Sequence, residues 1–540
     1  MLLVIVASAW TALPIFAQVG APPTTPLPIT TIPSDGFNMK VVEQLTPYYV
    51  ITTLDPPVFN WFAGTFTNLP TDKEVTIGLN MSGMDHIVNK ADVSKWVGGL
   101  KPVMTYADPT KYESYEWFTK DNLGRWVSGD PFKTDNLKYA GTGTVPDQHV
   151  IPANIAEQFL SKDTKFWSPW RPVDSTEIIS SLNILRIRQC FSMPTTTIAM
   201  HIPFPTALQQ AIIERIQRAK VPGISVDEIG KTMDGNPIRV IRIAHGDDSY
   251  PVSKGIRHSS EGYDIPIFKL SSQISDNDIL QKKVVVIFAR EHGNEVIGSW
   301  VVFGVFRSLV QKVYEKADDT LSGITWLLIP IIDIDLANRS HYDGGISSKF
   351  IYNYGSFGTK RQTPPEVIAY ITYLRAFVNA GYSLHLVLSL HNVECNEFHS
   401  TVMIPFTPIG TTEDVTKYNG FMFPRFNKKG VSTGTPKPIY PDFACLNRLG
   451  DFCYHRYGAL PITYEISDYN IQCNLLGITA IGELIEGGIV SYLNTEDGYK
   501  LLCNQSEFLY QQCMSRNEYW RNLHRTSVFV EMYDIFDNGF

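Results

Sequence analysis

Four strongly apolar segments in the second half of the chain constrain its fold more than any other feature. They read KVVVIFA, ITWLLIPIID, YSLHLVLSLH and LPITYEIS, and helical patterns such as VIGSWVVFGVFRSLVQKVYEKA and PPEVIAYITYLRAFVNA alternate with them. A strand that is apolar along its whole length is buried on both faces, and alternation of such strands with helices is typical of parallel sheets. The sequence therefore predicts an α/β fold, with a mixed, mostly parallel sheet and helices on both faces.

The first part of the chain follows a different pattern, and 540 residues are too many for one hydrophobic core. Between residues 40 and 204, short alternating segments such as KEVTIGLNMSG and LNILRIRQCFSM are separated by turn residues, which predicts an all-β sandwich domain. A helix with Pro205 in its first turn and a hairpin that turns at Asp234 and Gly235 then predict a linker over residues 205–245. The α/β domain is expected to occupy residues 246–540.

The first residues, MLLVIVASAWTALPIFA, contain no charged side chain and predict a signal peptide over residues 1–17. An uncleaved anchor is the alternative, although the apolar run is short for a membrane span. A Pro/Thr-rich linker is expected over residues 18–39, and no later segment predicts a transmembrane span. The protein is therefore expected to be secreted or lumenal, in an endomembrane or lysosome-like compartment.

Net charge and cysteine spacing narrow the classes of function. The net charge of −8 offers no basic surface, so no nucleic acid partner is expected. In an oxidising compartment the cysteines of the last third would allow up to three disulfides and leave Cys190 unpaired, although the sequence does not define the pairing. Metal binding by cysteine is disfavoured because the chain contains no CxxC pair.

A candidate metal site begins at REHGNEVIG, where an apolar strand gives way to a helix. His292 and Glu295 are three residues apart there, a spacing that means little by itself. His391 is expected as the last residue of its strand, and functional groups in such sheets gather at the carboxyl ends of strands. Two imidazoles and one carboxylate, with one position open to water, form a ligand set of catalytic zinc, so Zn²⁺ is the expected cofactor. The alternative is that His391 is a core histidine and His292 a neighbour of the helix N-cap. His385, further back on the same strand face, is expected to be structural.

Glu465 is the candidate for a general base. In ITYEIS it shares one strand face with Thr463 and Ser467, while apolar side chains face the other way. A carboxylate in the middle of a buried strand is costly unless it is paired or functional. Near zinc it would take a proton from the attacking water and pass it to the leaving amine. The alternative is a salt-bridged core glutamate.

The order and spacing of these motifs resemble a known family. HGNE, LLIPIID, PPEVIAYITYL, SLHNVECN and GDFCYHRYGALPITYEIS together resemble the zinc metallocarboxypeptidases. Upstream, WFAGTFTNL, HIPFPTALQQAII and EIGKTMDGNPIRVIRI are similar to the sandwich domain and linker of the cytosolic carboxypeptidase-like subfamily. The resemblance implies a hydrolase that cleaves at the C-terminus of a peptide or protein, with His292, Glu295 and His391 as zinc ligands and Glu465 as catalytic base. A signal peptide departs from the cytosolic setting of that subfamily.

The chain departs from the family where a carboxypeptidase must hold the terminal carboxylate of its substrate. The family uses an arginine and an Asn-Arg pair, because a guanidinium binds a carboxylate bidentately. Here Asp343 stands where the arginine is expected, and YNY stands at the Asn-Arg turn. The candidates for substrate binding, each of which would otherwise be a solvated loop residue, are Asn338, Arg339, Asn353, Arg361 and, in place of the family's catalytic tyrosine, Tyr440.

Three functions remain open from the sequence. The leading hypothesis is a zinc carboxypeptidase that removes C-terminal residues from peptides. The HGNE motif also occurs in the related aspartoacylase and succinylglutamate desuccinylase amidohydrolases, which lack a long N-terminal sandwich. The third hypothesis is an inactive binding module that keeps the fold; the altered carboxylate clamp favours it, whereas the complete ligand set and Glu465 argue against it. The sequence does not define the residue cleaved or the oligomeric state.

Overall fold

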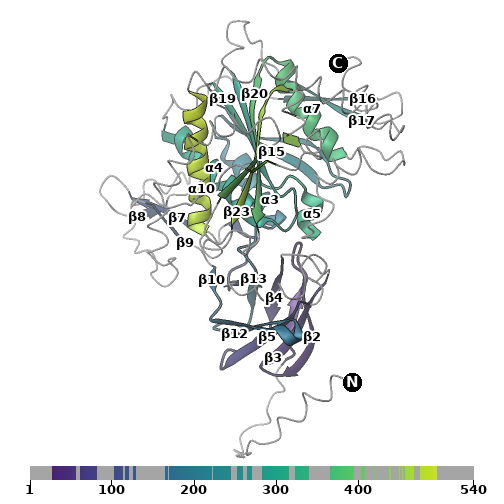
Figure 1. Ribbon diagram of the computed structural model, residues 1–540, viewed down its shortest axis with the longest axis vertical. Coiled ribbons are helices and arrows are strands. Elements are labelled where there is room, and N and C mark those ends of the chain that lie inside the picture. Colours follow the sequence, from purple (N-terminus) through teal and green to yellow (C-terminus); the bar gives the residue numbers. More distant parts are fainter. Residues whose placement is uncertain are drawn as a thin grey trace, which may run out of the picture.

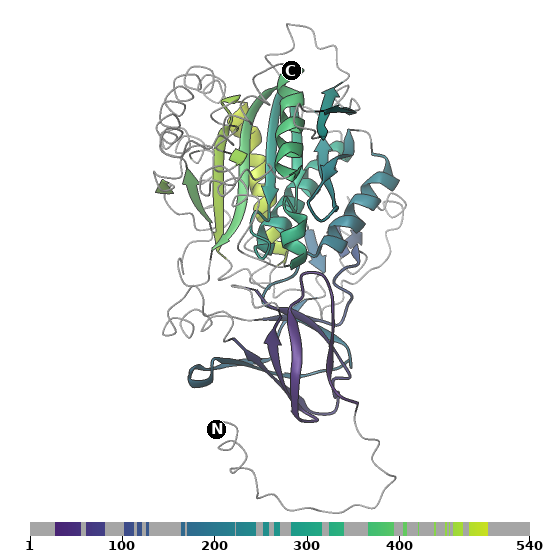
Figure 2. The ribbon, with the colours of Figure 1, turned by 90° about the vertical axis from the view of Figure 1, so that its right-hand side faces the viewer.

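The computed structural model describes the chain in segments, and Figures 1 and 2 both show strands from the first part of the chain at one end of a larger α/β unit. The described residues are 27–55, 61–81, 102–112, 116–120, 126–128, 164–167, 170–221, 223–244, 252–258, 264–270, 282–315, 323–339, 365–393, 403–407, 420, 437–438, 449–450, 453, 457–467 and 475–494.

Two five-stranded sheets make up the N-terminal unit. One has the strand order β1-β4-β13-β6-β10 and the other the order β11-β12-β5-β3-β2. Neighbouring strands are antiparallel except for the parallel pair β3 and β5. Side chains such as Phe66, Ile77 and Leu185 are fully buried in the core of this unit. The strands are β1 (Thr30–Ile32), β2 (Met39–Thr46), β3 (Tyr49–Leu54), β4 (Ala63–Thr67), β5 (Glu74–Asn80), β6 (Val103–Thr105), β10 (Arg171–Pro172), β11 (Ser175–Ile179), β12 (Ile184–Cys190) and β13 (Thr196–Ala199).

Strand β1 lies inside the stretch for which the sequence predicts a linker. Its three residues, TTI, pair antiparallel with Thr65, Phe66 and Thr67 of β4. Threonine and isoleucine favour the extended conformation, so a chain that runs along the open edge of a sheet can join it as a strand. Residues Thr30–Ile32 are therefore part of the first sheet, which the Pro/Thr-rich composition did not indicate.

An eight-stranded sheet forms the centre of the larger unit, in the order β14-β15-β19-β18-β20-β23-β21-β22. The four central strands β19, β18, β20 and β23 are the four apolar segments of the sequence, and they run parallel. β14 and β15 on one side are antiparallel to their neighbours, and β21 on the other side is antiparallel to β23, so the α/β fold with a mixed sheet is confirmed. The strands are β14 (Ile224–Lys231), β15 (Pro237–Ile243), β18 (Lys283–Ala289), β19 (Ile324–Ile329), β20 (Ser383–Val393), β21 (Met403–Thr407), β22 (Lys437–Pro438) and β23 (Leu460–Ser467).

Helices cover both faces of this sheet. α4 (Val296–Glu315) and α10 (Leu475–Leu493) lie against each other on one face, and α7 (Pro365–Asn379) covers the other (Figure 1). Glycines allow α4 and α10 to pack closely, because a Cβ on Gly304 would collide with the backbone of Thr479. None of the described helices is both long enough and apolar enough to cross a membrane.

Strand β20 differs from expectation in two details. It continues past His391 to Val393, because its last residues still pair with β23. Its register with β18 shifts at His385, which is an extra residue between Leu384 and Leu386. A bulge of this kind interrupts the alternation of side chains, so His385 does not simply share a face with His391 as the sequence suggested.

The segment that leads into α3 (Thr206–Ala219) contacts the α/β unit close to the carboxyl end of β18. Nε1 of Trp300, in α4, donates a hydrogen bond of 3.1 Å to Ile202 O. Nη1 of Arg290, directly after β18, donates a bond of 3.1 Å to Phe204 O. The junction of the two units therefore includes the turn and helix that follow β18. This turn also carries two of the candidate metal ligands.

Candidate metal centre

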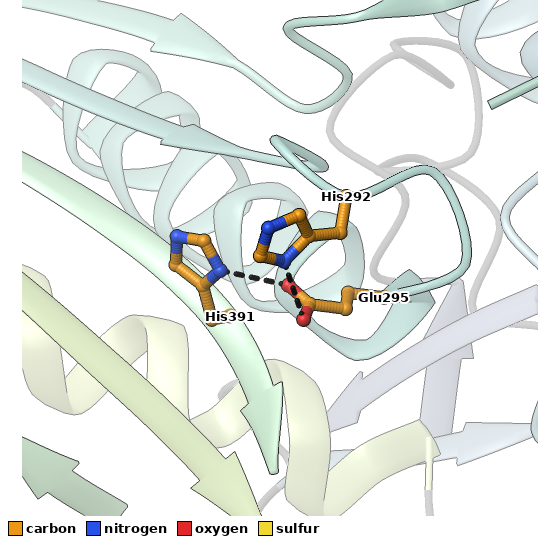
Figure 3. Close-up of side chains that lie close together, drawn as sticks. All are labelled: His292, Glu295 and His391. Carbon is orange, nitrogen blue, oxygen red and sulfur yellow. Dashed lines mark hydrogen bonds and ion pairs between the residues drawn. The ribbon is translucent and has the colours of Figure 1, made fainter. Parts of the chain in front are cut away.

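The first two predicted ligands lie in a tight turn between β18 and α4. β18 ends at Ala289 and α4 begins at Val296. Within this turn, Glu295 N donates a hydrogen bond of 3.2 Å to His292 O, and the two side chains face each other (Figure 3). The spacing of three residues therefore reflects a turn that brings an imidazole and a carboxylate together.

Close packing of α4 on the sheet sets this turn beside β20. A Cβ on Gly298 would lie 2.7 Å from Leu390 O and 2.9 Å from the Cβ of Ala289, distances that real side chains do not reach. Glycine at position 298 therefore lets the first turn of α4 touch β18 and β20 directly. As a result, Glu295 lies next to His391, the residue that follows Leu390 on β20.

The three predicted ligands converge on one point (Figure 3). Nδ1 of His292 lies 2.8 Å from Oε1 of Glu295, and Nδ1 of His391 lies 2.9 Å from Oε2 of the same carboxylate. The centroids of the two imidazole rings are 5.0 Å apart, and the potential ligand atoms all lie within 4.8 Å of one another. Glu295 and His391 are buried, whereas the His292 side chain keeps 19% of its surface exposed, so solvent reaches the site from the His292 side.

Burial and charge act in opposite directions on these groups. Burial would raise the pKa of Glu295, but His292 and His391 lower it to about 2. Burial would likewise lower the pKa of His391, but the carboxylates of Glu295 and Glu291 hold it well above its ordinary value. Since metal ligands must be deprotonated, a metal ion would replace the proton that these carboxylates favour on His391. The site is therefore built to hold positive charge.

The donor atoms fit zinc in type and in spacing. Oε2 of Glu295 and Nδ1 of His391 are buried and only 2.9 Å apart, yet neither atom makes a hydrogen bond within the described part of the chain. Donor atoms bound to one tetrahedral zinc lie roughly 3–3.5 Å apart. The Glu295 oxygens lie 2.8 and 2.9 Å from the two imidazole nitrogens, and the whole set of ligand atoms lies within 4.8 Å. His292, Glu295 and His391 would hold the ion and leave one coordination position for water or substrate.

The predicted general base lies on the neighbouring strand. In the parallel pairing of β20 with β23, Glu465 is the register partner of His391. Neighbouring strands lie about 4.8 Å apart, and the flanking Tyr464 and Ile466 pack in the core on the other face. Glu465 is half-buried and is one of the carboxylates that raise the pKa of His391. It therefore lies beside the candidate metal ligands.

The predicted substrate-binding residues are described only in part. Arg339, the last residue of α5 (Ile334–Arg339), forms an ion pair with Asp234 in the turn between β14 and β15. Oδ1 of Asn338 accepts a hydrogen bond of 2.6 Å from Thr206 at the start of α3. A role for either residue in substrate binding stays a prediction. Asn353, Arg361 and Tyr440 lie outside the described residues.

Glu291, one residue before His292, was not identified from the sequence. Its carboxylate is buried, and its Oε2 lies 2.7 Å from Nε2 of His391 and 2.9 Å from Oγ of Ser389. The sequence did contain a clue to its role, because a carboxylate directly after a buried strand needs a partner or a function. The partner could not be found in the sequence, since it is 100 residues away.

Arg290 is the second residue of this turn whose role the sequence did not indicate. It adopts a positive φ of 67°, which is uncommon outside glycine and costs free energy. Burial lowers the pKa of its guanidinium to about 9, and the charge of Glu295 acts against this shift. Its hydrogen bond to Phe204 O gives the buried charge a partner and ties the turn to the segment before α3.

Comparison with known proteins finds a family model that matches part of the chain. Residues 210–366 match the family model described as zinc carboxypeptidase. This segment contains His292 and Glu295, and the fold adds His391 and Glu465 from beyond it. The resemblance to the zinc metallocarboxypeptidases is therefore confirmed, and zinc is the metal of that family. The likeness to the cytosolic carboxypeptidase-like subfamily stays a prediction. No curated protein matches the chain.

Solved structures of metallocarboxypeptidases share the fold. A metallo-carboxypeptidase from Burkholderia cenocepacia aligns with a TM-score of 0.52 and 15% identity, over 86% of this chain and 98% of that one. A metallo-carboxypeptidase from Pseudomonas aeruginosa, in complex with (2-guanidinoethylmercapto)succinic acid, aligns with a TM-score of 0.50 and 13% identity, over 86% and 98%. At these identities the likeness shows the fold alone. Its coverage is too large for the α/β unit by itself, so it includes part of the N-terminal unit.

Proposed function

We propose that this protein is a zinc metallocarboxypeptidase that hydrolyses the C-terminal peptide bond of peptides or proteins. One observation carries the proposal: His292, Glu295 and His391 converge at the carboxyl edge of the sheet, and Glu465 is the register partner of His391. The zinc carboxypeptidase match of residues 210–366 supports the same class of reaction. We further propose that the two N-terminal sheets form the sandwich domain found in the cytosolic carboxypeptidase-like subfamily. Unlike that subfamily, this protein is proposed to be secreted or lumenal.

The roles of the residues follow from their positions. Zinc, when bound, supplies a Lewis acid that polarises the scissile carbonyl and lowers the pKa of a water molecule. Glu465 takes a proton from the attacking water and donates it to the nitrogen of the leaving amine, while the C–N bond breaks and a new carboxylate forms. His292, Glu295 and His391 stay deprotonated as ligands throughout. The exposed side of His292 provides the route by which a peptide terminus enters.

The experiment compares peptides that have free and amidated C-termini with acyl-amino acids, using zinc-loaded protein and mass spectrometry. Removal of single residues from free C-termini, with amidated peptides left intact, is the expected result. Equal cleavage of free and amidated peptides would exclude a carboxypeptidase. Hydrolysis of acyl-amino acids alone would establish an aspartoacylase-like amidohydrolase. Bound zinc without any turnover would establish an inactive module.

Arg339 is the first candidate for binding the substrate carboxylate, and Arg361 is the second. Arg339 is exposed and pairs with Asp234 when no substrate is bound. A bound substrate carboxylate would pair with it away from water, and removing one partner of such a buried charge pair costs about 2–5 kcal/mol, so Arg339→Ala should slow cleavage of free C-termini by at least about tenfold. A matched control is Arg186→Ala, because Arg186 also forms a surface ion pair, with Glu177 of the N-terminal unit. Normal cleavage by the Arg339 variant would transfer the assignment to Arg361 and leave the enzyme class intact.

A further inference from the structure

Glu291 has no part in the proposed reaction, yet it touches one of the metal ligands. It lies in the turn after β18, and its side chain is 1% exposed. Its Oε2 is 2.7 Å from Nε2 of His391, while Nδ1 of the same ring faces Oε2 of Glu295 at 2.9 Å. His391 is therefore held between two buried carboxylates, one on each ring nitrogen.

The two nitrogens of His391 must act differently for this ring to bind a metal. A neutral imidazole carries hydrogen on one nitrogen and a free lone pair on the other, and only the lone pair can bind a metal. An ionised carboxylate accepts hydrogen bonds and cannot donate them. When Glu291 accepts from Nε2, the hydrogen stays on that atom. The lone pair of Nδ1 is then directed at Glu295 and His292.

Ser389 fixes the position of the Glu291 carboxylate. Its hydroxyl donates a hydrogen bond of 2.9 Å to the same Oε2 that accepts from His391. Ser389 and His391 are two residues apart on β20, so both project from one strand face. Ser389 is also the register partner of Phe288 on β18, the strand that leads into the turn holding Glu291. The carboxylate is thus held by the same strand as the ligand that it contacts.

We propose that Glu291 is a positioning residue of the metal site, which holds the His391 ring and its hydrogen so that Nδ1 is the metal ligand. The inference rests on the proposed function in one respect only, namely that His391 binds the ion. Partners of this kind typically change metal affinity by about 10–100-fold when they are removed. Neither the spacing of the ligands nor the family match assigns this role to Glu291.

The experiment measures zinc affinity without any substrate, by competition with a chromophoric chelator. Glu291→Gln should bind zinc about 10–100-fold more weakly than the unaltered protein. The amide is a weaker acceptor, and its NH₂ group can donate to Nε2 and so favour the wrong tautomer of His391. Glu291→Asp, which keeps the charge, should recover part of the affinity. The absorption spectrum of the Co²⁺-loaded protein should change in the Gln variant, because one ligand is less firmly oriented.

Glu486→Gln is the matched control. Glu486 is also 1% exposed and forms an ion pair with Lys312 of α4, but the described contacts join it to none of the predicted ligands. Its substitution should leave zinc affinity within about twofold of the unaltered value, even if thermal stability falls. Loss of zinc affinity in both variants would attribute the effect to general loss of a buried charge and overturn the proposal.

The remaining outcomes separate this proposal from the proposed function. A folded Glu291→Gln variant with unaltered zinc affinity would overturn the role of Glu291 alone. If that variant does not fold, Ser389→Ala decides: loss of one hydrogen bond should weaken zinc binding roughly two- to tenfold, and no change would overturn the role. Zinc binding without peptide cleavage would contradict the proposed function but not the role of Glu291. Absence of zinc binding by the unaltered protein would sink the metal site and, with it, this inference.

Discussion

Two histidines on strand β20 have opposite properties, although they are only six positions apart in the sequence. His385 and His391 are 4% and 2% exposed, so both are buried to nearly the same extent. The pKa of His385 is lowered to about 4, whereas the pKa of His391 is raised well above the ordinary value. The two residues share their type, their strand and their degree of burial, so the difference in pKa comes from the groups that surround each ring.

The groups around each ring depend on its position along β20, because different segments lie beside the start and the end of this strand. His385 lies near the start of β20, where burial lowers its pKa. A hydrogen bond with Ser383 O raises the pKa, and the charge of Lys283 lowers it further. His391 lies near the end of β20, where the turn after β18 and the end of β23 bring three carboxylates close. In a parallel sheet, the turns at the carboxyl edge supply such groups, so this edge is where a histidine can become a metal ligand.

The strongest test of this comparison exchanges each histidine for glutamine in turn. His391→Gln should bind zinc at least about 100-fold more weakly, since loss of a ligand costs more than the 10–100-fold typical of its outer partners. His385→Gln should keep one zinc per chain. Metal analysis after gel filtration measures both. Equal loss of zinc in the two variants would mean that β20 is disrupted, and zinc retained by His391→Gln would exclude His391 as a ligand.

The second test concerns the residue opposite His391. Glu465→Gln should keep its zinc but hydrolyse peptides about 10²–10⁴-fold more slowly, because an amide cannot accept the proton of the attacking water. Steady-state turnover and zinc content, measured on the same preparation, separate the two effects. Glu486→Gln again serves as the control for loss of a buried carboxylate. Unaltered turnover in the Glu465 variant would exclude it as the base.

The sequence predicts much of this arrangement, because each group is a polar residue in an apolar context. His292, Glu295, His391 and Glu465 all stand out against apolar strand segments, and strand ends of one sheet share an edge. The apolar runs themselves define the four parallel strands, since such runs have no stable place except a buried sheet or helix.

The sequence could not predict contacts that depend on which strands are neighbours. The link from Glu291 to His391 spans 100 residues and exists only because β18 pairs with β20. The bulge at His385 is also a property of that pairing rather than of the local sequence. For the same reason the antiparallel strand β21, which pairs with β23, has no distinct signal of its own.

The third test uses the pKa of His385. Unfolded histidine has a pKa near 6.5, and the folded value is about 4, so between these pH values the unfolded chain binds a proton that the folded chain does not. The free energy of unfolding should therefore fall by about 3 kcal/mol as the pH drops from 6.5 to 4, through this residue alone. His385→Gln should remove that part of the loss. Urea unfolding of both proteins at a series of pH values, in EDTA to exclude metal release, measures the difference; parallel curves would contradict it.

The smallest expected effect comes from Lys283, at the start of β18. Burial is the main cause of the lowered pKa of His385, and the charge of Lys283 lowers it further. Lys283→Met should therefore raise that pKa toward 6.5. The acid-induced loss of stability should then be smaller than in the unaltered protein, by less than about 1 kcal/mol. Lys283 also donates a hydrogen bond to Leu493 O at the end of α10, so the variant is expected to be less stable at every pH. The test is therefore the change with pH rather than the absolute value. In a His385→Gln background, Lys283→Met should leave the pH dependence unchanged, and any remaining change would mean that Lys283 acts on a group other than His385.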